Sequence, residues 1–155
     1  MIRTRTIAAA LAVAGLAATI RTPLTAAGLK SPDAVKTALR LLVQVSNDMK
    51  RQITNKNFAR VPHEYQEYTE AADALPESIK DEPADFKTKV ENRLKAAVTA
   101  AQNVSKMSAT TTDVETLAAG HVKVVTAMNA VFDLFPADLR PDPNAAPPQR
   151  RPPAE

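Results

Sequence analysis

Apolar residues recur every three or four positions in four separate segments of this chain. That spacing aligns the apolar side chains along one face of a helix. The chain has no Cys, no Trp and only three Gly, while Ala is abundant, a composition that favours helices over strands. Without disulfides, a small domain must be stabilised by its apolar core. The pattern therefore predicts an all-α fold.

Each segment has one predicted core-facing stripe. The first comprises Val35, Leu39, Leu42, Ser46, Met49 and Ile53. The second comprises Val61, Tyr65, Tyr68, Ala72, Leu75 and Ile79. The third comprises Phe86, Val90, Leu94, Ala97, Ala101, Val104 and Ser108. The fourth comprises Val114, Leu117, His121, Val124, Met128, Val131 and Phe135.

The residues that flank these stripes predict where the helices begin and end. Ser31-Pro32 is a hydroxyl N-cap followed by a first-turn proline. Pro76 should stop or kink the second helix at Leu75, since proline lacks an N–H and clashes with the preceding turn. Thr112 and Glu115 have the spacing of a capping box, and the fourth helix should close at Pro136.

Helices of similar length joined by short connections pack as antiparallel neighbours. We therefore expect residues 28–136 to form an up-down-up-down antiparallel four-helix bundle. The rival architecture is a longer helical hairpin that dimerises, so a homodimer stays open. Residues 137–155 carry many of the chain's 12 prolines and are expected to form a disordered, Pro-rich C-terminal tail.

Residues 1–27 have the three parts of a cleavable secretory signal. Arg3 and Arg5 precede an apolar run, Ile7–Ile20, and small residues then lead to a cleavage site before Gly28. The run is shorter than the roughly 20 residues of a membrane-spanning helix, so an uncleaved membrane anchor is the less favoured alternative. We expect a periplasmic or secreted protein.

Charge gives little support for a nucleic-acid partner. Three of the 20 Lys and Arg residues lie in residues 1–27, so the remaining chain has 17 basic and 17 acidic residues. Nucleic-acid binding needs clustered excess of Lys and Arg, which is not present. Any partner is therefore expected to be a protein of unknown identity.

Residues 64–85 are rich in acids, but no metal site is expected there. Glu64, Glu67, Glu70, Asp73 and Glu77 are predicted to point outward and to fan around their helix, whereas Ca²⁺ needs six to eight converging oxygens. His63 with Glu67 offers too few ligands for zinc. The acids are expected to form a solvated surface.

His121 interrupts the apolar stripe of the fourth segment. The favoured interpretation is a buried histidine bonded to Ser46, Tyr68 or a backbone carbonyl, because burying such a group unpaired is costly. In an antiparallel bundle His121 and Met49 would differ by only about 4–5 Å along the axis. The alternative is therefore a His–Met pair that holds a haem iron axially.

The chain resembles the periplasmic haem bundles, cytochrome c-prime and its b-type relatives, between Ser31 and Phe135. The resemblance is carried by a signal peptide, a short second helix ending in Leu75-Pro76, and an Ala-rich third helix opened by Pro83-Ala84-Asp85-Phe86. The c-type haem attachment motif, C-x-x-C-H, is absent. The b-type relatives use a Met on the first helix and a His on the last helix. In these relatives the pair lies near the opposite end of the bundle from Met49 and His121. The resemblance thus implies haem b held non-covalently by Met49 and His121.

Catalytic and phosphate-binding motifs are absent from the sequence. We therefore expect a non-enzymatic exported bundle that acts as a binding, accessory or structural module without a cofactor. The alternative is a carrier of non-covalent haem or metal, for electron transfer or sensing, that uses His121 and Met49.

Overall fold

The computed structural model describes residues 28–142 and contains four long α-helices, α1 (Pro32–Thr54), α2 (Val61–Ser78), α3 (Ala84–Ser108) and α4 (Val114–Phe132). Two 3-10 turns, η2 (Phe58–Arg60) and η3 (Ala137–Leu139), lie before α2 and after α4. The signal peptide and most of the tail predicted from the sequence lie outside the described residues.

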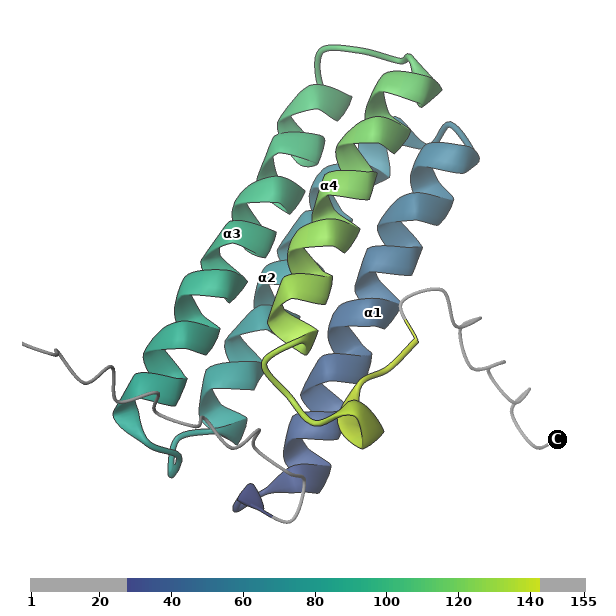
Figure 1. Cartoon of the computed structure of the whole chain (residues 1–155). Helices are drawn as coiled ribbons and strands as arrows, with labels where there is room; N and C mark the ends of the chain where they lie inside the picture. Colours follow the sequence, from purple (N-terminus) through teal and green to yellow (C-terminus); the bar gives the residue numbers. More distant parts are fainter. Residues whose placement is uncertain (1–27, 143–155) are drawn as a thin grey trace, which may run out of the picture.

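The helices alternate in direction and form a four-helix bundle within one chain (Figure 1). α1 packs against α2, α2 against α3 and α3 against α4, and α4 closes the bundle by packing against α1. The predicted up-down-up-down architecture is therefore confirmed. No strand occurs between residues 28 and 142.

The predicted stripes form one continuous core. All residues of the first predicted stripe are buried, including the polar Ser46. The residues of the fourth stripe, including His121, are also buried, except Val114, which is partly buried. On α3, Ala97 and Ala101 are completely buried, so this helix approaches its neighbours closely. Tyr65 is only partly buried. The three-four spacing thus identified the core-facing side of each helix.

Glu64 was predicted to point outward, but it is buried. It is 4 % exposed and its Oε1 accepts a hydrogen bond of 2.9 Å from Nε2 of Gln52 on α1. Gln52 in turn accepts from the side chain of Asn57 in the connection between α1 and α2. Glu64 lies one turn after Val61 and one turn before Tyr68, so it occupies the same inner face as these two residues.

Several helix ends differ from prediction. Ser31 makes no side-chain capping bond, although Pro32 does begin α1. Asp113, and not Thr112, caps α4, because its carboxylate accepts from the backbone N–H groups of Glu115 and Thr116. α2 continues through Pro76 to Ser78. Pro76 has no N–H to donate to the preceding turn, so α2 lacks this hydrogen bond and ends two residues later.

The packed domain extends beyond Pro136. After α4 the chain turns back and places η3 beside α1 (Figure 1). Leu139 is 5 % exposed, and Arg140 donates from Nε to the carbonyl oxygen of Phe135 at 2.7 Å. Phe135 also packs edge-on against Phe86 at the start of α3, with ring centroids 5.6 Å apart. Residues 137–140 therefore belong to the bundle and not to the predicted tail.

Candidate functional sites: a buried histidine and the α3–α4 groove

His121 joins α4 to α1 inside the core. Its Nε2 atom lies 2.8 Å from the backbone carbonyl oxygen of Ser46 and 3.1 Å from the hydroxyl oxygen of the same residue. A carbonyl oxygen can only accept a hydrogen bond, so Nε2 carries the proton and donates it to Ser46. The predicted partner Ser46 is thus confirmed, whereas Tyr68 is not a partner of His121.

The environment of His121 favours the neutral imidazole. Burial lowers the pKa of His121 because the charged form loses its hydration. The hydrogen bond to the Ser46 backbone acts in the opposite direction, and the positive charge of Lys50 lowers the pKa further. His121 is therefore neutral near pH 7 and acts as a polar link between two helices.

Met49, the second predicted haem ligand, is completely buried on α1. It follows Ser46 by three residues, which is about 4.5 Å along the helix axis. Because His121 contacts Ser46, the axial offset between His121 and Met49 agrees with the one expected from the sequence. An iron ion at Nε2 would require the nitrogen to lose its proton and both contacts with Ser46. Met49 and His121 could therefore hold a haem only if the contacts between His121 and Ser46 were broken.

Tyr68 places another polar group in the core. Its side chain is completely buried, and its hydroxyl has no hydrogen-bond partner among the described residues. Burial raises the pKa of this hydroxyl far above its usual value, so the group is always protonated. A buried hydroxyl without a partner costs free energy. The apolar spacing predicted that Tyr68 is a core residue, but it gave no sign that its hydroxyl is buried without a hydrogen-bond partner.

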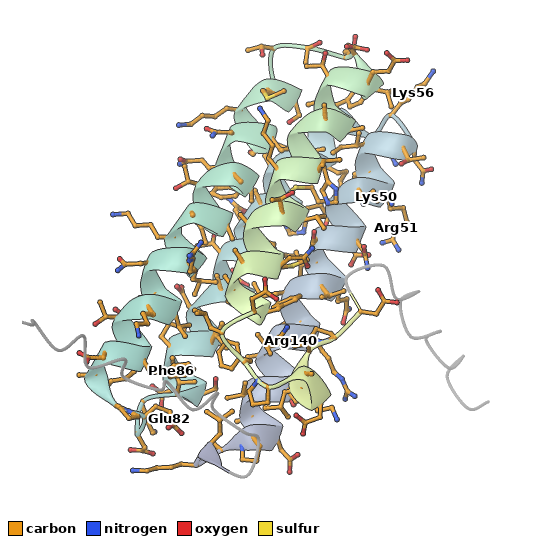
Figure 2. The ribbon with its side chains drawn as sticks, viewed as in Figure 1. Lys50, Arg51, Lys56, Glu82, Phe86 and Arg140 are labelled. Carbon is orange, nitrogen blue, oxygen red and sulfur yellow. The ribbon has the colours of Figure 1, made fainter. Side chains whose placement is uncertain are left out.

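The acidic side chains of residues 64–85 do not converge in the described structure. Among residues 28–142, no three His, Asp or Glu side chains are placed so that they could share an ion. His63 is a surface residue, 3.3 Å from Glu67 one turn further along α2. Glu82 is buried and accepts a 2.7 Å hydrogen bond from the backbone N–H of Lys30, so it holds the N-terminal segment against the bundle (Figure 2).

The solvent-facing side of α4 is unusually poor in charge. Between Val114 and Phe132 the only charged residues are Glu115 and Lys123. Val122 is 61 % exposed, more than any other large apolar residue among residues 28–142. By contrast, α1 carries exposed cations such as Lys50 and Arg51 along its outer side (Figure 2). An exposed helix face with few charges and an exposed apolar side chain favours contact with another molecule.

A groove runs beside this face, between α3 and α4. Its first section, of about 600 Å³, has walls of small residues that include Ala100, Ala119 and Gly120. A second section, of about 330 Å³, is lined by residues that include Ala96, Ala127 and Ala130. Lys123 borders both sections, so they adjoin each other along α4, and together we call them the α3–α4 groove.

Gly120 sets the depth of the first section. A Cβ atom at this position would lie 3.1 Å from Cγ2 of Val104 and 3.5 Å from Cε of Met107, so the missing side chain lets α3 and α4 approach closely. This contact was not predicted from the sequence, although a glycine inside a helical segment is a recognisable signal, because glycine there is otherwise unfavourable.

Comparisons with known proteins give no assignment: no protein family, no curated protein and no solved structure matches the chain. Within the described residues, no helix combines the length and the apolar character needed to cross a membrane.

Proposed function

We propose that this protein is an exported, non-catalytic binding module, and that it binds its partner with the outer face of α4 and the adjoining groove. The observation that carries the proposal is the exposed Val122 on a helix with almost no charged residues. Maintaining such a surface in water has no benefit for folding, but it allows contact with a partner. The partner is a protein, and no nucleic acid or cofactor is needed.

Export before Gly28 is compatible with the way the bundle begins. Leu29 is 6 % exposed and belongs to the core, and the backbone N–H of Lys30 is bonded to Glu82. Cleavage between residues 27 and 28 would keep both contacts. Mass spectrometry of material from the cell envelope should therefore show an N-terminus at or near Gly28, and a species that retains Met1 in the membrane fraction would contradict cleavage.

Binding can be tested inside the producing cell with a photoreactive amino acid. Placed at Val122, it should yield one or a few defined cross-linked products that mass spectrometry can identify. The matched control is Thr99 on α3, which is exposed but does not line the groove. Equal cross-linking from both positions, or none from Val122, would contradict the proposed binding face.

The second candidate is a carrier of haem b that uses Met49 and His121. It is favoured by the burial of both residues within about one turn of each other, and by the likeness to the haem bundles described above. Against it stands the hydrogen bond from Nε2 to Ser46. An absorbance spectrum of protein purified from its native compartment separates the two candidates. A Soret band that His121→Leu abolishes would establish the carrier.

A further inference from the structure

We infer that the α3–α4 groove receives an amphipathic helix of an acidic partner protein. This inference rests on the proposed function, and it specifies the chemistry of the partner. The groove passes from Thr116 to Ala130 along α4, a length of about 21 Å at 1.5 Å per residue. A helix of about 14 residues has this length.

The small residues of the groove suit a helix better than an extended peptide. Helices pack at interaxial distances of 8–10 Å, and shorter side chains at the contact allow the closer end of this range. Ala96 and Ala100 on α3 and Ala119, Ala127 and Ala130 on α4 all line the groove, so small apolar side chains make up much of its floor. An incoming helix can therefore bury apolar residues spaced three and four positions apart.

The charges of the groove point to an acidic helix. Arg93, Lys106 and Lys123 are the only charged residues that line it, and all three are exposed cations. Arg93 and Lys106 lie about 20 Å apart along α3, near opposite ends of the groove, and Lys123 lies between the two sections. Carboxylates along one flank of the incoming helix would pair with these cations. An incoming helix with Lys or Arg on that flank would be repelled.

A second copy of this chain fits the groove poorly. Lys123 is the central residue of α4, so a two-fold contact between two α4 helices would place two Lys123 side chains together. The acidic helix of the chain itself, α2, exposes Glu67, Glu70, Asp73 and Glu77, but its large apolar residues are buried in the core. It could meet the cations, but it could not fill the apolar floor.

The test uses a synthetic peptide as the probe. It is an 18-residue capped helix with Leu and Ala at three-four spacing and Glu on one flank, and the matched peptide has Lys in place of Glu. Fluorescence anisotropy with the purified protein should show saturable binding of the Glu peptide. The Lys peptide should bind at least tenfold more weakly, and the affinity for the Glu peptide should fall as salt is raised.

Two pairs of variants assign binding to the groove. Ala119→Trp fills the groove, whereas Ala74→Trp changes an exposed residue of α2, which does not line it. Lys123→Glu reverses a lining cation, whereas Lys95→Glu reverses an exposed cation elsewhere on α3. Ala119→Trp and Lys123→Glu should each weaken binding at least tenfold, and their controls less than twofold. All four positions are on the surface, and circular dichroism verifies the fold.

Three results would overturn the inference. The first is no saturable binding of the Glu peptide, or binding that Ala119→Trp leaves unchanged. The second is self-association in sedimentation experiments that Ala119→Trp abolishes, which would assign the groove to a second copy. The third is binding to anionic phospholipid vesicles with the same dependence on Ala119. Defined cross-links from Val122 without peptide binding would preserve the binding module and reject only the acidic helix.

Discussion

The Nε2 atom of His121 donates a hydrogen bond to the main-chain carbonyl of Ser46, and this bond joins α4 to α1 in the middle of an otherwise apolar layer. Because the oxygen belongs to the backbone, no side-chain substitution at position 46 can remove this acceptor. The bond therefore constrains the register of the two helices more firmly than a contact between two side chains.

The burial of His121 makes the stability of the bundle depend on pH. The pKa of His121 is lowered in the folded protein, so below about pH 6.5 the unfolded chain binds a proton that the folded chain resists. The free energy of unfolding should be retained above this pH and should fall as the pH falls, by at most about 1.4 kcal/mol per pH unit for one proton. Urea unfolding between pH 5 and 7.5 measures this slope.

His121→Leu is the control for that experiment. The variant should have a flatter profile over the same pH range, and at pH 7 it should be as stable as the natural protein or more stable, because an apolar side chain replaces a partly satisfied polar one. Identical pH slopes in both proteins would show that His121 is not the residue responsible.

Tyr68→Phe should stabilise the bundle or leave it unchanged. The substitution removes a buried hydroxyl that has no partner, and it keeps the ring that fills the core. The expected gain is about 1 kcal/mol in the free energy of unfolding, measured by urea denaturation. Tyr65→Phe, at a partly buried position one turn earlier, is the matched control and should have a smaller effect. A loss of more than about 1 kcal/mol in Tyr68→Phe would reveal a hydrogen bond to this hydroxyl.

The positions of the alanines in α3 give a direct test of packing. Ala101 is completely buried, so Ala101→Leu should overpack the core and cost about 1–3 kcal/mol. Thr99→Leu places the same side chain on the exposed side of the same helix and should cost less than about 0.5 kcal/mol. Thermal and urea unfolding measure both changes. Equal costs would mean that the interior of α3 has been assigned to the wrong residues.

The sequence predicted the helices and their inner faces because both follow from local periodicity. Leu42, Leu94 and Val124 are buried where the three-four spacing places them. The sequence did not predict the burial of Glu64, because the predicted stripe ran through Tyr65 and placed Glu64 outside it. The hydrogen bond from Gln52 to Glu64 accounts for this burial. The proline content of residues 137–155 likewise predicted a disordered tail and gave no sign of η3. The position of η3 depends on contacts with α1, which is far away in the sequence.

Of the candidate sites, His121 was recognisable because it broke a regular pattern, and its partner Ser46 was one of three predicted possibilities. The α3–α4 groove was not recognisable. It depends on which small residues of two helices face each other, and that arrangement is set by how α3 and α4 are rotated and by the close approach at Gly120. When α3 or α4 is considered alone, its alanines indicate only a high helix propensity.

The end of the packed domain can be located by truncation. Ending the chain after Pro136 removes Leu139, which is buried against the bundle, and Arg140, which bonds to Phe135 and to Asp133. This truncation should lower the melting temperature by several degrees, since it exposes apolar surface and leaves the Phe135 carbonyl without its guanidinium donor. Ending the chain after Asp142 retains both residues and should leave the melting temperature within about one degree. Leu139→Ala in the full-length chain should reproduce much of the first effect, at a cost of about 2–3 kcal/mol. If the two truncations melt at the same temperature, Leu139 does not contribute to the core and the domain ends at Pro136.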